Sequence, residues 1–394
     1  MITTSLKIAF HTMVHEGWTV GEIYLRNLFY ALRRAYGKGI GLYLLTPAGL
    51  QYTKSYASSI EADGIVQYNM PRRWTFSWLL NGAFRRIFLR DLLMEKFLKE
   101  HQIDVVFGPT FIHRFSRIGI LSWIPDFQHI HLPEMFSHEE CLSRDRTFLQ
   151  CGRLSTRLIA MSDSVRRDYE SFAPMYAHKV RVLYPITYVP ESIYNYDLHS
   201  ILNLYRLPEK FVYLPNQFWK HKNHELVFRA VKALKDNGIK ISVVCTGNPV
   251  DYRHPTYFAG LCSRVSEWGI RDQVINLGLI PREHVLLCMR QSVCVLNPSL
   301  FEGWGYTVDE ARSVGKQVLL SDIPAHREQN PPKATFFDPR DCDDLTAKLG
   351  QIWLNTEPGP DAELESESRR ALPDRLRAYG EAFFSVAQEA FEVE

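Results

Sequence analysis

The stretch NPSLFEGWGYTVDE, residues 297–310, lies between an apolar run and a segment with helical character. The apolar run, Val293–Leu296, ends at a turn-forming Asn-Pro pair and predicts a short buried strand. Helical character returns over Val308–Val314. A buried strand, a glycine-containing loop and a helix in this order predict one unit of a parallel α/β fold.

Two carboxylates and two glycines occupy this loop and the start of its helix. Glu302 falls on the loop, and Glu310 falls in the first turns of the helix. Backbone N–H groups at a helix N-terminus attract phosphate oxygens, and Gly303 and Gly305 let the main chain approach a ligand closely. The carboxylates can accept hydrogen bonds from hydroxyl groups on either side of the phosphates. A ligand with a diphosphate in the middle and sugar hydroxyls at both ends is a nucleotide sugar.

The stretch resembles the Glu-x7-Glu motif of the retaining glycosyltransferases of family 4, which have the GT-B architecture. The resemblance implies that Glu302 holds hydroxyls of the donor sugar and that Glu310 holds the nucleotide's ribose. It also implies that the chain between them binds the diphosphate, through Gly303, Trp304, Gly305, Tyr306 and Thr307. The alternative is that these acidic residues only interact favourably with the helix macrodipole near the helix start.

A basic loop over residues 213–224 gives a second signal, between a predicted strand and a predicted helix. Negative charge builds on the departing diphosphate as the glycosidic bond breaks, so cations are needed there. The loop resembles the family's phosphate-binding loop, with Lys222 and Asn223 as the matching pair. Many members carry an arginine where this chain has Asn216. Either Lys220 supplies that charge or one cation with amide dipoles suffices.

Two further glycine turns follow strands in the second half, and they add Gly247, Ile280 and Arg282 to the predicted donor site. Gly247 allows a sharp reversal beside the nucleotide. The run Leu277–Arg282 resembles the family segment whose backbone contacts the base edge. Since uridine diphosphate sugars are the commonest donors in such families, UDP is favoured over GDP.

The first half offers two candidate segments for the donor and acceptor. Gly17 lies in a short loop after the first strand and resembles the family's glycine loop. Asp126 follows another strand, and Pro125 stands where relatives often have a histidine. Asp126 is therefore the third predicted catalytic residue, beside Lys222 and Glu302. His129 is a tentative acceptor contact, with loop packing as the alternative.

The mechanism implied by the resemblance needs neither a metal nor an enzyme nucleophile. The leaving diphosphate and the incoming hydroxyl share one face of the sugar, and a phosphate oxygen takes the proton. The sequence Asp341-Cys342-Asp343 has the D-x-D spelling that binds metal in other transferases. It stands at a predicted helix start, where capping explains the acids.

Composition is that of an ordinary two-domain protein. The chain has 394 residues, of which 46% are hydrophobic and 23% charged, and the net charge of +2 does not favour general nucleic-acid binding. Seven scattered cysteines without a C-x-x-C pair indicate a reducing cytoplasm and argue against zinc or disulfides. We expect neither a secretory signal nor a transmembrane helix.

Short apolar runs alternate with helix-period segments along the whole chain, which predicts two doubly wound parallel α/β domains. A proline-punctuated linker, Tyr184–Glu191, separates residues 1–188, the predicted acceptor-binding domain, from residues 192–372, the predicted nucleotide-sugar domain. A charged tract, Glu357–Arg370, predicts an exposed turn. The last helix is expected from Pro373, within residues 373–394, crossing back to the first domain as in GT-B enzymes. The predicted strands are Leu6–His11, Gly41–Leu45, Gly64–Tyr68, Asp104–Phe107, Gly119–Trp123, Leu158–Met161, Val180–Leu183, Phe211–Leu214, Ile241–Cys245, Val274–Leu277, Val293–Leu296, Gln317–Leu320 and Thr335–Phe337. The predicted helices include Gly21–Arg34, Arg85–His101, His224–Asn237, Arg282–Arg290 and Thr307–Val314.

Pro71–Arg90 interleaves arginines with aromatics and holds no acid. This composition suits an anionic bilayer surface or the phosphate of a lipid-linked acceptor. A partly buried helix with solvated arginines is the alternative. The tentative contacts are Arg72, Arg73, Trp74 and Trp78.

Together these features predict a retaining, metal-independent hexosyltransferase of the cytoplasm. Peripheral contact with the inner face of the membrane is a further expectation. Its donor is a UDP-sugar such as UDP-glucose, and its acceptor is a saccharide or lipid-linked saccharide of a cell-surface polysaccharide. A nucleotide-sugar epimerase of the same fold and a non-catalytic nucleotide-sugar-binding protein are the alternatives.

Overall fold

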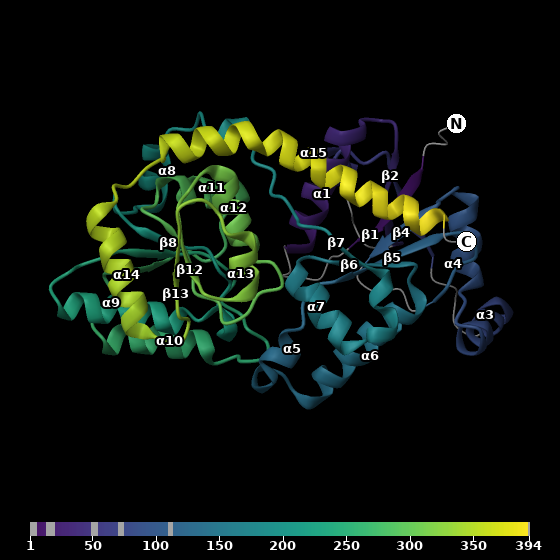
Figure 1. Ribbon diagram of the computed structural model, residues 1–394, viewed down its shortest axis with the longest axis horizontal. Coiled ribbons are helices and arrows are strands. Elements are labelled where there is room, and N and C mark those ends of the chain that lie inside the picture. Colours follow the sequence, from purple (N-terminus) through teal and green to yellow (C-terminus); the bar gives the residue numbers. More distant parts are fainter. Residues whose placement is uncertain (1–5, 13–19, 49–53, 70–74, 109–112, 393–394) are drawn as a thin grey trace. The chain divides into compact units, whose positions relative to one another are not determined.

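The computed structural model describes residues 6–12, 20–48, 54–69, 75–108 and 113–392. The chain forms two compact α/β units (Figure 1). Unit 1 comprises Met1–Phe127, His138–Ile186 and Pro373–Glu394, and unit 2 comprises Gln128–Ser137 and Thr187–Leu372.

Unit 1 is built on a seven-stranded parallel sheet in the order β3-β2-β1-β4-β5-β6-β7. Its central strands are buried on both faces, as Ile8, Ala9 and Phe10 of β1 illustrate, which is typical of parallel sheets covered by helices. The strands are β1 Lys7–His11, β2 Gly41–Pro47, β3 Gly64–Tyr68, β4 Val105–Gly108, β5 Gly119–Ile124, β6 Arg157–Ala160 and β7 Val180–Val182.

The helices of unit 1 confirm the predicted alternation, with one correction. They are α1 Val20–Tyr36, α2 Lys54–Ser59, α3 Phe76–Ile87, α4 Leu92–Glu100, α6 His138–Leu154 and α7 Asp163–Phe172, with a 3₁₀ turn at Pro174–Lys179. A single helix over Arg85–His101 is wrong, because Leu89 adopts a left-handed φ of 53°. A new helix begins after Asp91, whose carboxylate accepts a hydrogen bond from the Met94 amide at 2.9 Å.

Unit 2 is built on a six-stranded parallel sheet in the order β10-β9-β8-β11-β12-β13. Helices lie on both faces of this sheet, with α11 and α12 on one side and α9 and α10 on the other (Figure 1). The strands are β8 Val212–Leu214, β9 Val243–Cys245, β10 Val274–Asn276, β11 Val295–Asn297, β12 Val318–Ser321 and β13 Ala334–Phe337. Every strand predicted in either half is present, so the prediction of two parallel α/β domains is confirmed.

The helices of unit 2 alternate with its strands, and α9, for example, buries Val227 and Val231 in the core. They are α5 Gln128–His131, α8 Leu198–Tyr205, α9 His224–Asp236, α10 Tyr257–Glu267, α11 Arg282–Gln291, α12 Tyr306–Val314, α13 Pro324–Gln329 and α14 Cys342–Asn355, with 3₁₀ turns at Pro133–Met135, Glu191–Ile193 and Lys220–Lys222. Asp341 caps α14 by accepting hydrogen bonds from the amides of Asp343 and Asp344 at 2.9 and 3.1 Å. The capping interpretation of this acidic run is therefore confirmed.

The last helix, α15, covers Ala362–Glu392 and contains Pro373 in its interior. The predicted turn over Glu357–Arg370 is therefore wrong for most of its length. Strong helix formers fill the first turns, and the Asp361 carboxylate accepts a hydrogen bond from the Leu364 amide at 3.1 Å. The division between the two units falls at Pro373, where the helix lacks one backbone donor.

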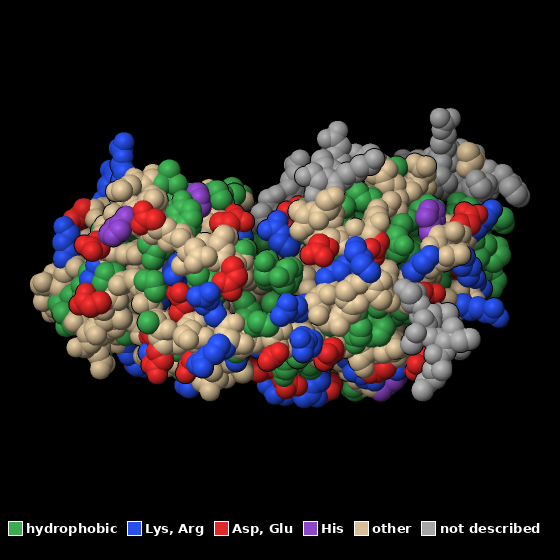
Figure 2. Space-filling view, turned by 90° about the horizontal axis from the view of Figure 1, so that it is seen from above, with side chains coloured by type: hydrophobic (Ala, Val, Ile, Leu, Met, Phe, Trp, Pro, Cys, Tyr) green, Lys and Arg blue, Asp and Glu red, His purple; other side chains and the backbone are tan. Residues whose placement is uncertain are grey.

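Acidic and basic side chains are interspersed on the face of the molecule shown in Figure 2. No large field of one sign therefore covers that face, in keeping with a net charge of +2. No helix among the described residues is long and apolar enough to cross a membrane.

Candidate functional site

Unit 2 brings two loops together at the carboxyl ends of β8 and β11. These strands are neighbours in the sheet although β9 and β10 lie between them in the sequence. The strand order reverses at this point, and in open α/β sheets ligands bind at such a switch point. The loop after β8 carries Lys222, and the loop after β11 carries Glu302. The two loops singled out from the sequence are therefore adjacent in space.

Lys222 and Glu302 form an ion pair, with Nζ and Oε1 2.5 Å apart. Their side chains are only 21% and 11% exposed, so the charges interact in a partly desolvated setting. Burial by itself would raise the pKa of Glu302. The Lys222 ammonium, with smaller contributions from His221 and His326, more than offsets this effect, and the pKa falls to about 2. Glu302 is therefore an ionised hydrogen-bond acceptor at neutral pH.

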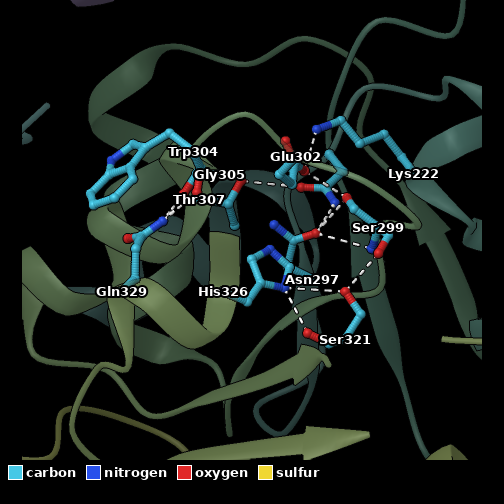
Figure 3. A network of polar contacts seen from close by, with 11 residues as sticks. Lys222, Asn297, Ser299, Glu302, Trp304, Gly305, Thr307, Ser321, His326 and Gln329 are labelled. Atoms are coloured by element: carbon cyan, nitrogen blue, oxygen red, sulfur yellow. Dashed lines mark hydrogen bonds and ion pairs between the residues drawn. The ribbon is translucent and has the colours of Figure 1, made fainter. Parts of the chain in front are cut away.

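A network of buried polar groups orients the Glu302 loop (Figure 3). The Ser299 hydroxyl lies 2.6 Å from Glu302 Oε1 and 2.7 Å from Asn297 Oδ1. Ser321 at the end of β12 donates a hydrogen bond to the Ser299 carbonyl at 2.6 Å. Sequence reasoning missed both serines. The signal that could have found them is a polar residue directly after, or at the end of, an apolar strand.

His326 lies behind the same loop and is fully buried. Its Nδ1 is 2.9 Å from the Ser321 carbonyl, while its Nε2 has no hydrogen-bond partner among the described residues. Burial lowers the pKa of His326 to about 4, so the imidazole is neutral at pH 7. A Cβ added at Gly305 would approach Nε2 to 3.3 Å, so His326 limits what can occupy position 305.

Asn216 ties the first loop to the second. Its Nδ2 donates to Asn297 Oδ1 at 3.0 Å, and its Oδ1 accepts from the Thr307 hydroxyl at 3.1 Å. The amide is 3% exposed, so its role within the described residues is to hold β11 and α12 in register with the β8 loop. Lys220 is exposed, and its backbone amide is anchored on Asp251 Oδ2 at 2.9 Å.

Asn223 occupies the junction between the basic loop and α9. Its φ of 57° is left-handed, a region that asparagine tolerates better than most residues. Its side-chain amide donates to the carbonyls of Pro298 at 3.2 Å and Pro339 at 2.9 Å. In this structure Asn223 therefore braces the Lys222 loop against the loop after β11.

The start of α12 presents backbone N–H groups beside these side chains. Gly305 precedes the helix with a left-handed φ of 86°. The Gln329 amide donates to the carbonyls of Trp304 at 2.5 Å and Gly305 at 3.1 Å, and this fixes the loop (Figure 3). Leading N–H groups of a helix have no intrahelical acceptor, so this helix start suits a phosphate.

Glu310, on α12, contacts Arg282 at the start of α11. The ion pair joins Arg282 Nη1 to Glu310 Oε1, and the side chains are 19% and 8% exposed. Both residues were predicted in the donor site, but nothing in the sequence indicated that they pair. Ile280, two residues before Arg282, is half-buried and no specific contact marks it.

Gly247 is required by close packing under the β8 loop. Its φ is +148°, and a Cβ there would lie 2.4 Å from the Asn216 carbonyl oxygen. The predicted sharp turn after β9 is present, and the Gly247 amide donates to the Gly278 carbonyl at 2.9 Å. Its contact is with the protein's own backbone.

Of the candidates from the first half of the sequence, the structure describes the side chains of Asp126 and His129. Asp126 belongs to unit 1, where Arg144 Nη2 contacts its Oδ1 at 2.5 Å and its carbonyl at 3.0 Å. His129 groups with unit 2 and is buried beside Phe136. Gly17, Arg72, Arg73 and Trp74 lie outside the described residues, as does the side chain of Trp78.

One contact in this region was not predicted. The His131 ring stacks on Phe301, the residue before Glu302, with 4.9 Å between centroids. Among the described residues no group of three or more His, Cys, Asp and Glu side chains is placed to hold a metal ion.

Comparisons with known proteins agree with this geometry. Residues 203–370, which lie within unit 2, match the family described as "Glycosyl transferases group 1". The chain is 24% identical over 175 residues to an uncharacterized glycosyltransferase of Methanocaldococcus jannaschii, and the match covers 43% of each chain, so it spans less than half of that relative.

Solved structures resemble the whole chain at low identity. A glycosyltransferase from Rickettsia africae aligns with a TM-score of 0.67 and 14% identity, over 99% of this chain and 100% of that one. An Anabaena protein determined in complex with UDP and glucose aligns with a TM-score of 0.65 and 14% identity, over 97% of both chains. A sucrose-phosphate synthase from Thermosynechococcus elongatus aligns with a TM-score of 0.65 and 15% identity, over 97% and 96%. The fold is that of the GT-B glycosyltransferases, and residues 203–370 of unit 2 are similar to the glycosyl transferases group 1 family.

Proposed function

We propose that this protein transfers a hexose, with retention of configuration and without a metal, from a UDP-sugar such as UDP-glucose to a saccharide or lipid-linked saccharide acceptor. The observation that carries the proposal is the Lys222–Glu302 pair at the switch point of unit 2, beside the N-terminus of α12. A cation, an ionised acceptor and the N–H groups of a helix N-terminus are what a nucleotide sugar needs at one place.

Each group has a role in this proposal. Lys222 and the leading amides of α12, including those of Tyr306 and Thr307, bind the diphosphate and stabilise its charge as it departs. Glu302 accepts hydrogen bonds from hydroxyls of the donor sugar, and Glu310 accepts them from the ribose. UDP is favoured because the resemblance to family 4 favours it and because the Anabaena structure contains UDP and glucose.

Retention follows when the acceptor attacks the face of the sugar from which the diphosphate departs. The bond between the anomeric carbon and the phosphate oxygen breaks, and a bond to the acceptor oxygen forms on the same face. The acceptor's proton passes to a phosphate oxygen, so no side chain acts as an indispensable nucleophile. Trapping of a sugar covalently bound to the protein would contradict this part of the proposal.

Calorimetric titration with UDP, GDP and ADP tests the donor site. We expect micromolar binding of UDP that a chelator does not change and that Glu310→Ala weakens at least tenfold, because a charged hydrogen-bond partner is lost. Absence of binding by all three nucleotides would overturn the donor site.

Product analysis with and without acceptors separates the reactions. Epimerised nucleotide sugar without acceptor would indicate an epimerase of the same fold. Binding without hydrolysis or transfer across many acceptors would indicate a sensor.

We further propose that unit 1 binds the acceptor in the cytoplasm and that its helix α3 contacts the inner face of the membrane. Leu80, Ile87 and Phe88 are 47%, 71% and 58% exposed, and their spacing places them along one side of α3 and its C-terminal end. Two arginines of the basic stretch are paired with acids, Arg85 with Asp91 and Arg90 with Glu95. The support for membrane contact therefore comes more from the exposed apolar side chains than from the arginines of this stretch, two of which are paired with acids.

Flotation with anionic vesicles tests this contact. We expect the wild-type chain to float and the Ile87→Glu, Phe88→Glu double variant to lose most of its binding, since each glutamate removes apolar contact and adds charge repulsion. Leu354→Glu, at an exposed leucine of α14 in unit 2, is the matched control and should float like the wild type. Failure of the wild type to float would rule out the contact.

A further inference from the structure

We propose that Arg282 is a positioning residue that orients Glu310 toward the donor's ribose and thereby makes the site select ribonucleotides over deoxyribonucleotides. The inference rests on the proposed function and adds a determinant of specificity to it.

Arg282 is the first residue of α11 and Glu310 belongs to α12, and these two helices lie on the same side of the unit 2 sheet (Figure 1). The guanidinium reaches Glu310 through Nη1, which contacts Oε1. The other carboxylate oxygen, Oε2, has no hydrogen bond within the described part of the chain. Glu310 is thus held by one oxygen, and its second oxygen remains able to accept from a ribose hydroxyl.

The hydrogen bonds of Arg282 are incomplete, unlike those of buried arginines with a purely structural role. Arg290 uses its three nitrogens on Glu365 and on the Ile193 carbonyl. Arg33 uses its three on Asp63 and on backbone carbonyls. Arg282 Nη2, by contrast, is buried without a partner in the described structure. Buried donors are normally satisfied, so this nitrogen indicates a partner supplied by the ligand.

The side-chain chemistry explains why orientation depends on the arginine. A glutamate side chain has three rotatable bonds, and ordering it costs conformational entropy when the ligand binds. The guanidinium makes a charge-assisted contact with Glu310 through one nitrogen, so Arg282 orders Glu310 before the nucleotide arrives. Without Arg282 the mostly buried carboxylate loses its counter-charge and turns toward water.

The test compares UDP with 2′-deoxy-UDP and 3′-deoxy-UDP in calorimetric titrations. We expect the wild type to prefer UDP over at least one deoxy form by roughly 10–100-fold, the range for a hydrogen bond to a charged group. Arg282→Met should lower the affinity for UDP by a similar factor, while the affinity for the disfavoured deoxy nucleotide changes little. The ratio of the UDP affinity to the deoxy-nucleotide affinity should therefore come close to one. Glu310→Gln should have the same signature, and the double variant should lose no more than either single variant.

Controls keep the result interpretable. Arg282→Lys keeps the charge but lacks the planar guanidinium, so its ratio of UDP affinity to deoxy-nucleotide affinity should lie between the ratios of the wild type and Arg282→Met. If Arg282→Met does not fold, Arg282→Lys takes its place in the test. Arg271→Met removes an exposed arginine ahead of β10 and should change none of the three affinities. An unchanged ribo-to-deoxy ratio in the folded Arg282 variants overturns this inference alone. Failure of the wild type to bind any nucleotide overturns it together with the proposed function.

Discussion

Glu302→Gln is expected to lower the rate of sugar transfer by about 100–1,000-fold while changing UDP affinity by less than about threefold. The carboxylate is ionised, with its pKa lowered to about 2, and in the proposed function it accepts hydrogen bonds from hydroxyls of the donor sugar. Glutamine preserves the shape but turns one acceptor oxygen into a donor and removes the negative charge. UDP lacks the donor hexose, so its binding should not depend on this group.

Steady-state kinetics with the UDP-sugar and calorimetry with UDP measure the two effects separately. The matched control is Glu225→Gln, which neutralises an ion-paired glutamate on α9 whose partner is Arg229 at 2.6 Å. That variant should keep wild-type kinetics. Equal losses of UDP binding and transfer in Glu302→Gln would show that Glu302 maintains the site as a whole instead of holding the sugar.

Lys222→Met is expected to weaken UDP binding about 100-fold and to lower transfer by at least about 1,000-fold. In the proposed function the cation binds the diphosphate in the ground state, and it does so more strongly as charge develops. Methionine retains much of the aliphatic stem. It also leaves Glu302 mostly buried without its counter-charge, which adds a cost to the folded state.

The nucleoside uridine isolates the phosphate contribution, since it lacks the diphosphate. Its affinity in competition titrations should be the same for Lys222→Met and the wild type. Lys240→Met serves as the control, because Lys240 is ion-paired to Asp272 at 2.6 Å but 69% exposed. A proportional loss of uridine binding in Lys222→Met would show that the substitution disrupts unit 2 more widely.

The sequence allowed the strands and the two principal loops to be predicted, because these depend on local patterns. Apolar runs bounded by turn residues located the strands, and strand–loop–helix order placed Lys222 and Glu302 at the same edge of the sheet. The start of α15 was not predicted. Proline is common in the first turn of a helix, so Pro373 indicated a helix start, whereas it lies inside α15.

The side-chain contacts could not be predicted in the same way. The Arg282–Glu310 pair, the Asn216–Asn297 bond and the Ser321–Ser299 bond each join residues that are distant in sequence and meet only once the sheet has formed. The identity of a serine or asparagine does not indicate its partner. Asp126 illustrates the same limit for a predicted residue. Its place after a strand made it a site candidate, but its ion pair with Arg144 within unit 1 could not be predicted.

The packing of Gly247 against the Asn216 backbone has a consequence for how this protein tolerates mutation. Any side chain at position 247 would push the β8 loop away from β11 and α12, since a Cβ would also lie 2.7 Å from Gln217 Cα. Such a change would displace the β8 loop, which carries Lys222, although position 247 itself contacts only the protein's own backbone. Position 247 is therefore restricted to glycine by the packing around it.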